Sequence, residues 1–260
     1  MRESRKWTAF PSHDKNDRHA FNDEKWPTLA EFFRIQRGIA TGDNKFFILL
    51  REDAKSRGLP TKYLRPILPS PRYLKETVID VDDEGYPLVG RQLCVIDCDL
   101  SENLLEQRHP DLWKYLQSGE VLGVRDGYLA SKRNPWYKQE QREPSPFLCT
   151  YMGRGTDDKS PFRFILNRSN AIATNLYLML YPRNGFEIML GEHPHRAAEV
   201  YELLGRVTAH ELRGVGRVYG GGLNKIEPSE LGRVSAAAFL DRWPELFEGM
   251  KRTKTQSLFE

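Results

Sequence analysis

The turn between Arg37 and Lys45 carries side chains that can bind phosphate. Gly38 and Gly42 bracket it, and Arg37, Thr41 and Lys45 lie around it. Backbone N–H groups in such a turn, together with nearby cations, can hold a phosphate oxygen. By composition alone an ordinary glycine turn that leads into a strand is the stronger reading. The turn is not a P-loop, because the Gly-Lys-Ser/Thr ending is missing.

A second basic segment covers residues 125–142 and interleaves cations with aromatic side chains. It contains Arg133, Trp136 and Tyr137 among other basic residues. Basic side chains can neutralise phosphates, and aromatic rings can stack on exposed bases. The alternative is a solvated basic loop whose aromatic residues anchor it to the core. Composition leaves these two readings nearly even.

The tetrapeptide Asn134-Pro135-Trp136-Tyr137 resembles the Asn-Pro-Pro-Tyr signature of adenine methyltransferases. That signature offers hydrogen-bond acceptors to the adenine amine and an aromatic face to a flipped base. Trp136 replaces the second proline, and no glycine-rich cofactor loop precedes the motif. The sequence therefore favours a structural Asn-Pro turn, and we expect no catalytic residue in this chain.

Two glycine-containing turns provide further candidate contacts. Arg154 lies between Gly153 and Gly155, where it can reach a guanine edge or a phosphate. Residues 220–228 begin with three glycines and continue to Asn224 and Lys225, so that the backbone can approach a ligand closely. A plain surface turn and a flexible linker are the respective alternatives.

Other classes of site find little support in the sequence. The six histidines follow no metal-ligand spacing, and no nucleophile–base set stands out. Cys94, Cys98 and Cys149 are expected to be buried reduced thiols, as in a reducing cytosol. No apolar run is long enough to span a bilayer, and the chain begins without a signal-peptide core, so we expect a cytoplasmic protein without a membrane partner. The net charge of +3 is too small to identify a partner.

Apolar patterns predict an α+β fold, with a mixed sheet, flanking helices and long loops. We expect an N-terminal arm over residues 1–26, one large domain over 27–250 and a basic tail over 251–260. Within the domain, strands are predicted over residues 44–50, 93–100, 162–166 and 171–180. Helices are predicted over residues 28–33, 52–57, after Ser101, from Pro110 to Gly119, 196–213 and 236–250.

Taken in order, these segments resemble the C-terminal region of adenine-specific restriction–modification DNA methyltransferases. Each motif is weak alone, but their order is fairly specific, and the resemblance extends from about residue 28 to residue 231. The segments that carry it are Arg37–Phe47, Pro66–Ser70, Gly119–Glu120, Arg133–Tyr137, Met152–Arg154, Asn167 with Ala173–Asn175, and Gly220–Pro228.

The resemblance implies sequence-specific recognition of double-stranded DNA on behalf of a methyltransferase. In that family a separate catalytic domain binds S-adenosylmethionine and carries the Asn-Pro-Pro-Tyr motif. We expect this chain to lack that domain, to bind no cofactor itself, and to act with a catalytic domain or subunit as its partner. A self-contained methyltransferase that uses Asn134 and Tyr137, and a protein-interaction (specificity) subunit, are the alternatives.

The expected DNA contacts fall into three groups. One group would bind backbone phosphate, a second would lie near the bases, and the third would touch a second strand. The groups are Arg37, Thr41 and Lys45; Arg133, Trp136, Tyr137 and Arg154; and Asn224 with Lys225.

Overall fold

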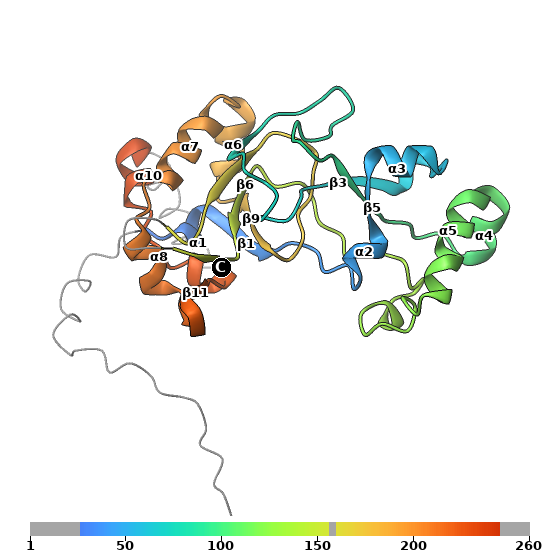
Figure 1. The fold of residues 1–260 in the computed structure, drawn as a ribbon. Coiled ribbons are helices and arrows are strands. Elements are labelled where there is room, and N and C mark those ends of the chain that lie inside the picture. Colours follow the sequence, from blue (N-terminus) through green and yellow to red (C-terminus); the bar gives the residue numbers. More distant parts are fainter. Residues whose placement is uncertain (1–26, 156–159, 245–260) are drawn as a thin grey trace, which may run out of the picture.

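A five-stranded mixed sheet lies at the centre of the protein, with its strands in the order β1-β9-β6-β8-β4 (Figure 1). The structure is a computed structural model that describes residues 27–155 and 160–244. The expected arm over residues 1–26 and the expected tail over 251–260 lie outside the described residues. The strands are β1 (Phe33–Arg37), β4 (Val78–Ile79), β6 (Phe147–Thr150), β8 (Phe164–Asn167) and β9 (Tyr177–Pro182).

The pairing of these strands confirms the predicted α+β class with a mixed sheet. β4 runs parallel to β8, whereas β1 and β6 both run antiparallel to β9. β1 and β6 therefore point in the same direction on either side of β9. Their C-terminal ends emerge at the same edge of the sheet, next to the start of β9.

Both faces of this sheet are buried, so successive side chains of its strands enter two different cores. In β6, Phe147 and Cys149 belong to one hydrophobic cluster, and Leu148 belongs to the other. Strands β8 and β9 alternate in the same way. Burial on both faces explains why these strands are nearly continuous apolar runs rather than alternating polar and apolar residues.

The first cluster, which we call the helical core, is covered by short helices. Phe32, Phe33, Phe186 and Phe239 meet here with ring centroids 5.3 to 6.0 Å apart. These contacts fix β1 against helices from both ends of the domain. The covering helices are α1 (Leu29–Phe32), α6 (Phe186–Glu192), α7 (Arg196–Gly205), α8 (Ala209–Val215), α9 (Pro228–Leu231) and α10 (Ala237–Arg242).

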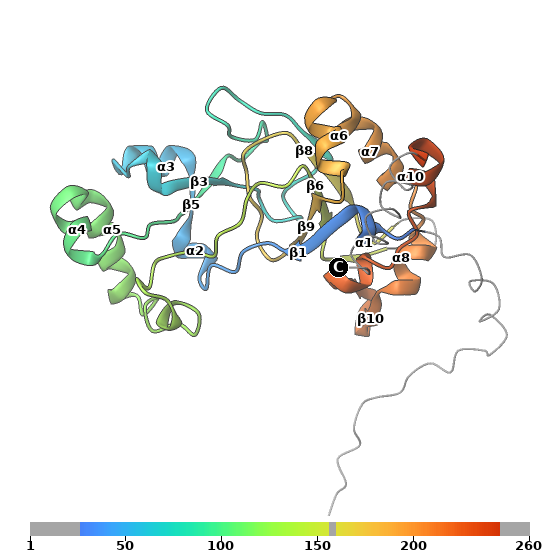
Figure 2. The same cartoon turned by 180° about the vertical axis from the view of Figure 1, so that it is seen from behind.

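The second cluster, the sheet core, extends from the central sheet to a smaller antiparallel sheet of order β2-β5-β3. Helices α4 and α5 lie beyond this small sheet, at the far end of the molecule from α7 and α10 in both views (Figures 1 and 2). The elements are β2 (Ile48–Leu50), α3 (Arg51–Ser56), η2 (Thr61–Tyr63), β3 (Leu64–Ile67), β5 (Leu93–Ile96), α4 (Glu102–Arg108), α5 (Pro110–Val121) and η3 (Ala130–Lys132).

A third sheet, antiparallel and of order β10-β11-β7, lies against the helical core. Its strands are β7 (Met152–Arg154), β10 (Arg217–Tyr219) and β11 (Leu223–Lys225). Residues Gly220–Gly222 form a 3-10 turn, η4, that joins β10 to β11 as a hairpin. We call these three strands the small basic sheet.

Several expected elements have different bounds in the structure. The predicted strand over 44–50 begins as a helix, α2 (Asn44–Phe47), because the carboxylate of Asp43 accepts hydrogen bonds from two N–H groups of the first turn. The predicted helix over 196–213 is two helices, since Thr208 and Glu211 form a capping box that starts α8. Gly119 lies within α5 instead of ending it.

Other predicted helices and strands are present in full or in part. Helices near 52–57 and after Ser101 and the strand near 162–166 are present, while the strand expected over 171–180 is confined to Tyr177–Pro182. The helix expected over 236–250 is described only as α10, and residues 245–250 lie outside the described residues.

The backbone after β1 passes too close to a neighbouring segment to accept a side chain at residue 38. The N–H of Ile39 donates to the carbonyl of Ala173 at 2.9 Å. A Cβ atom added to Gly38 would lie 2.2 Å from the carbonyl oxygen of Ala173 and 2.4 Å from that of Thr174. This glycine is therefore required by packing within the protein.

We expect Gly38→Ala to lower the free energy of unfolding by about 2 kcal/mol, because the added methyl group forces two packed segments apart. Urea denaturation followed by tryptophan fluorescence measures the change. Gly90→Ala is the control, since a Cβ at Gly90 meets no atom within 4 Å. Equal midpoints for Gly38→Ala and the unaltered protein would contradict this packing role.

Candidate nucleic-acid interface

Arg37 and Tyr151 meet at the edge where β1 and β6 end. Arg37 is the last residue of β1, and Tyr151 directly follows β6. The guanidinium of Arg37 lies 4.3 Å from the centroid of the Tyr151 ring, and it also donates to the carbonyl of Asn175 at 3.4 Å. Arg37 is exposed whereas Tyr151 is buried. The ring thus supports a cation that faces solvent.

Glu227 fixes both Tyr151 and Lys225. Its Oε1 accepts a hydrogen bond from the Tyr151 hydroxyl at 2.6 Å and lies 2.9 Å from the Lys225 ammonium. Burial acts to raise the pKa of Glu227, but the hydrogen bonds from Lys225 and Tyr151 outweigh it and lower that pKa. The same contact with Glu227 raises the pKa of Lys225. Glu227 is therefore a carboxylate, paired with a cation.

Helix α9, which begins directly after Glu227, holds a second cation of the small basic sheet, Arg217. Glu227 is the N-cap of α9, and Glu230 completes a capping box with it. The Glu227 N–H donates to Oε2 of Glu230 at 2.8 Å, and Oε1 of Glu230 accepts from Nε of Arg217 at 2.7 Å. One helix start therefore supplies the carboxylates for both Lys225 and Arg217.

Arg154 is exposed at the end of β7, and its Nε donates to the carbonyl of Gly221 at 3.3 Å. Within residues 27–155 and 160–244, no carboxylate lies within 4.0 Å of the guanidinium of Arg154 or Arg37. Asn224 is buried, and its amide donates to the carbonyl of Gly222 at 3.1 Å. Asn224 thus shapes the hairpin from inside, while Arg154 presents a charge outside.

Arg133 and Thr41 hold the turn between Gly38 and Gly42 in place. Arg133 donates to the carbonyls of Ala40 and Thr41, the latter at 2.8 Å. Burial lowers the pKa of Arg133. Thr41 is buried, and its hydroxyl donates to Oδ1 of Asn44 at 2.6 Å. Lys45, on α2, is another predicted contact near this turn, and unlike Thr41 it is exposed.

Trp136 and Tyr137, which the sequence analysis expects near the bases, lie in the core. Trp136 is 4% exposed and Tyr137 is 0% exposed. The Trp136 ring packs with centroids 6.1 Å from Phe46 and 5.9 Å from Phe47, and the Tyr137 hydroxyl donates to the carbonyl of Leu100. Large aromatic side chains gain more from burial in the core than from solvent exposure. Neither ring faces a base in this conformation.

Sequence reasoning missed the roles of Glu227, Glu230 and Arg217. Pro228 at the first helical position, with glutamates on either side, was a readable sign of a helix start. The alternation from Arg217 to Tyr219 before three glycines was a readable sign of a hairpin strand. The contact of Glu227 with Tyr151 had no local signal, because it joins distant parts of the chain.

The described residues offer no other evident centre for chemistry. In residues 27–155 and 160–244 no three histidine, cysteine or acidic side chains are grouped to hold a metal ion. Cys94, Cys98 and Cys149 are buried free thiols as expected, and burial raises the pKa of Cys94 to about 11. No helix in this part of the chain has the length and apolar character needed to cross a bilayer.

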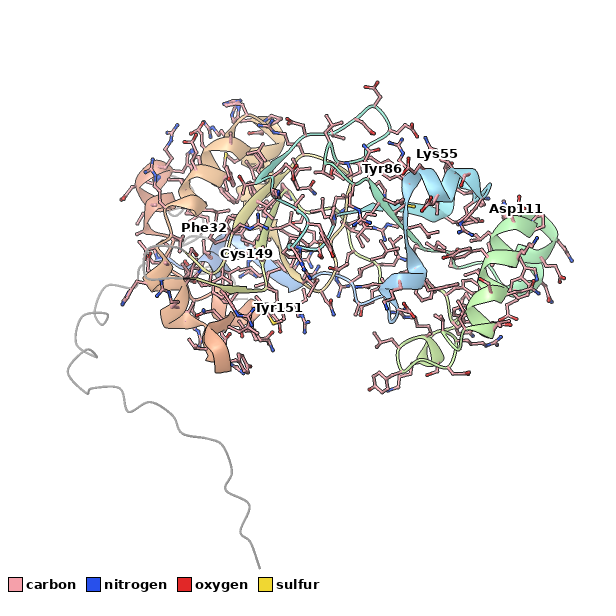
Figure 3. The ribbon with its side chains drawn as sticks, viewed as in Figure 1. Phe32, Lys55, Tyr86, Asp111, Cys149 and Tyr151 are labelled. Atoms are coloured by element: carbon pink, nitrogen blue, oxygen red, sulfur yellow. The ribbon has the colours of Figure 1, made fainter. Side chains whose placement is uncertain are left out.

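The expected contact residues that are exposed lie along one side of the molecule. In Figures 1 and 2 the small basic sheet, the end of β1 and α2 lie along the lower side. Figure 3 places Tyr151 on that side and Lys55 and Tyr86 on the opposite one. On the upper side Arg51 is paired with Asp82 and Glu84, at 2.6 and 2.5 Å.

Comparisons with known proteins identify similar sequences. A family model described as "Type II methyltransferase M.Eco57I, C-terminal domain" matches residues 4–257. The type II methyltransferase M.XamI of Xanthomonas campestris pv. amaranthicola is 29% identical over 206 residues, which are 79% of this chain and 35% of that protein. M.AccI of Acinetobacter calcoaceticus is 26% identical over 232 residues, 88% of this chain and 39% of that protein.

The chain thus spans between a third and two fifths of the length of these curated relatives. Among solved structures, the type IIL restriction-modification enzyme MmeI in complex with DNA matches with a TM-score of 0.40 and 11% identity. The match covers 61% of this chain and 20% of that one.

The charge of Glu227 makes a pH-dependent contribution to stability. Its pKa is lowered from 4.5 in the folded protein, so its contribution is present above about pH 4.5 and is lost as the pH falls through the folded pKa. We expect Glu227→Gln to lower the free energy of unfolding by about 1 kcal/mol near pH 7. Near pH 3.5 the difference shrinks, because protonated glutamate is neutral like glutamine.

Urea denaturation of both proteins at the two pH values measures this effect. Glu76→Gln is the control, since Glu76 is exposed and its carboxylate accepts a hydrogen bond from the neighbouring N–H of Lys75. The free energies of unfolding of Glu227→Gln and of the unaltered protein are compared at each pH. If their difference stays constant from pH 7 to pH 3.5, the charge of Glu227 contributes nothing to stability.

Proposed function

Because the chain belongs to the family of C-terminal domains of the type II methyltransferase M.Eco57I, we propose that it recognises a specific sequence in double-stranded DNA. It does so for an adenine-specific, S-adenosylmethionine-dependent restriction–modification methyltransferase in the cytoplasm. Its partner is a methyltransferase catalytic domain or subunit, which transfers the methyl group.

The observation that carries this proposal is the charge of the small basic sheet. Its three strands contain Arg154, Arg217 and Lys225 and no carboxylate. Arg37 adds a fourth cation across the buried ring of Tyr151. The surface thus places several cations next to one another, as a polyanion such as the DNA backbone requires.

The cations of this surface differ in how firmly they are held. Lys225 and Arg217 are paired with Glu227 and Glu230, which reduces the positive charge that they offer to a ligand. Arg37 and Arg154 have no such partner within 4.0 Å in the described residues, and each is oriented by a contact to a ring or a carbonyl. These two arginines are therefore the principal proposed DNA contacts, with Lys45 as a further phosphate contact.

Thr41, Arg133 and Asn224 enter the proposal as residues that support the contact surface. Arg133 and Thr41 hold the turn that precedes Lys45, and Asn224 holds the hairpin next to Arg154. Their side chains are used within the protein, so their effect on DNA binding is indirect. Lys225 remains a proposed contact at the base of the hairpin, with its charge shared with Glu227.

The residues described do not fit an S-adenosylmethionine site. Such a cofactor is commonly held by a glycine-rich turn between a parallel strand and a helix. The parallel pair among the named strands of the described residues is β4 with β8, and both strands lead into loops. We therefore assign cofactor binding to the catalytic partner.

The self-contained methyltransferase is disfavoured by the burial of Tyr137, whose ring would have to stack on a flipped adenine.

A protein-interaction role predicts one large apolar patch. The largest exposed apolar side chains of the described residues are instead divided among the loop between β3 and β5, the end of α5 with the segment that follows it, α6 and the small basic sheet. They include Tyr73, Leu88, Val121, Leu122, Tyr128, Ile188, Val218 and Tyr219.

Titration of a fluorescently labelled mixed-sequence duplex at several salt concentrations tests the proposed function. We expect the logarithm of the association constant to fall linearly with the logarithm of the salt concentration. The expected slope is about −3, since about three phosphate contacts are proposed. Calorimetry with S-adenosylmethionine is the companion measurement. Cofactor binding without DNA binding by this chain would refute the proposal.

Arg37→Ala and Arg154→Ala separate phosphate contacts from base contacts. We expect Arg37→Ala to weaken binding equally on all duplexes and to reduce the salt slope by about 1. Arg154→Ala distinguishes the two roles open to Arg154: loss of a guanine contact costs about 1–3 kcal/mol on some duplexes and less on others, whereas loss of a phosphate contact weakens binding to all duplexes alike.

Gel-shift titrations on a panel of duplexes measure both effects, and Lys45→Ala is the phosphate-contact comparison. Arg72→Ala, an exposed arginine in the loop between β3 and β4, is the control and should bind like the unaltered protein. Equal losses for Arg154→Ala on every duplex would exclude base reading by Arg154.

A further inference from the structure

The two faces of the small basic sheet are unlike. From the strand register, Val218, Asn224 and Gly153 lie in one row across the sheet. Their side chains point to one face, because neighbouring residues of paired strands share a face. Asn224 is buried, and a Cβ on Gly153 would lie 1.8 Å from the carbonyl oxygen of Pro161. Other parts of the protein therefore cover this face of the sheet at β11 and β7.

The other face is open and carries the cations. The two rows on it pair Arg217 with Lys225 and Met152, and Tyr219 with Leu223 and Arg154. All six side chains are exposed or partly exposed. The face combines three cations with one tyrosine ring and two apolar side chains, and it contains no acidic residue of its own.

Charge is distributed unevenly along the hairpin. At its base, Arg217 and Lys225 are neutralised by Glu230 and Glu227. At its tip, Arg154 has no carboxylate within 4.0 Å in the part of the chain that the structure describes. Tyr219 lies in the same row of the sheet, on the far side of Leu223, and is 45% exposed, with its ring centroid 5.9 Å from the Lys225 ammonium. An exposed arginine and an aromatic ring therefore lie in the row of the sheet that is next to the tip.

The tip itself has no side chains. Gly221 and Gly222 have φ angles of 74° and 71°, and a Cβ on either glycine would meet no atom within 4 Å. The side of the turn toward which these Cβ atoms would point is therefore open among the described residues, and the backbone there can come close to a ligand. Figures 1 and 2 show the hairpin projecting from the lower side of the molecule.

From this geometry we infer that the β10–β11 hairpin enters the major groove of the DNA duplex, with Tyr219 and the glycine tip against the base edges and Arg154 on a flanking phosphate. The inference rests on the proposed function and names the element that reads the DNA. Paired strands lie about 4.8 Å apart, and β7 pairs with β11, so the hairpin and β7 together span about 9.6 Å before their side chains are added. Such a ribbon fits a major groove about 12 Å wide but not a minor groove about 6 Å wide.

Blocking one groove at a time tests this placement on the intact chain. The major groove is filled by using duplex DNA whose cytosines carry glucosylated 5-hydroxymethyl groups, and the minor groove is filled with netropsin. We expect the glucosylated duplex to bind at least tenfold more weakly than the unmodified duplex of the same sequence. We expect netropsin to change the affinity less than twofold.

Tyr219→Ala tests the role of the tip. We expect it to weaken binding to unmodified DNA at least fivefold and to leave the salt slope unchanged, because the lost contact carries no charge. Arg154→Ala, by contrast, should reduce the slope. Tyr73→Ala is the matched control, since Tyr73 is 58% exposed and lies in the loop between β3 and β4.

The outcomes separate this inference from the proposed function. If the unaltered chain binds no duplex, the proposed function fails. If it binds with a steep salt dependence but glucosylation has no effect, or Tyr219→Ala binds like the Tyr73→Ala control, the hairpin inference is overturned and DNA binding stands. If Tyr219→Ala does not fold, as judged by circular dichroism, the groove measurements on the unaltered chain decide.

Discussion

Burial of the central sheet on both faces is the constraint on which the arrangement of the rest depends. With the helical core on one side and the sheet core on the other, β6, β8 and β9 cannot shift by one residue without exchanging the side chains of the two cores. The register of β1 and β6 against β9 is therefore fixed. That register brings Arg37 and Tyr151 to the same edge, although they lie far apart in the chain.

From this edge the contact surface is built by short extensions of the sheet. β6 continues through Tyr151 into β7, which pairs with the hairpin, so the small basic sheet is attached directly to a strand of the core. Elements placed on a rigid scaffold hold their side chains more precisely than free loops do. The aromatic ring of Tyr151 connects the two parts, with a cation on its face and a carboxylate on its hydroxyl.

The sequence was informative where the signal was local. Apolar runs located β5, β8 and β9 approximately, and proline and serine located the starts of α4 and α5. The sequence could not tell whether an aromatic residue in a basic segment stacks on a ligand or fills a core. Trp136 and Tyr137 fill the core because Phe46, Phe47 and Leu100 are brought to them by the tertiary fold. Likewise, Arg133 was recognised as basic, but its use for carbonyls of the same chain depends on long-range contacts.

The capping box of α9 has a consequence for how the small basic sheet can be exchanged. Glu227 and Glu230 start the helix and at the same time hold Lys225 and Arg217. Transplanting a hairpin from a relative into this scaffold would separate those cations from their carboxylates if the exchange stopped at the end of β11. The smallest self-consistent unit of exchange is therefore residues 217–231, hairpin and first helical turn together.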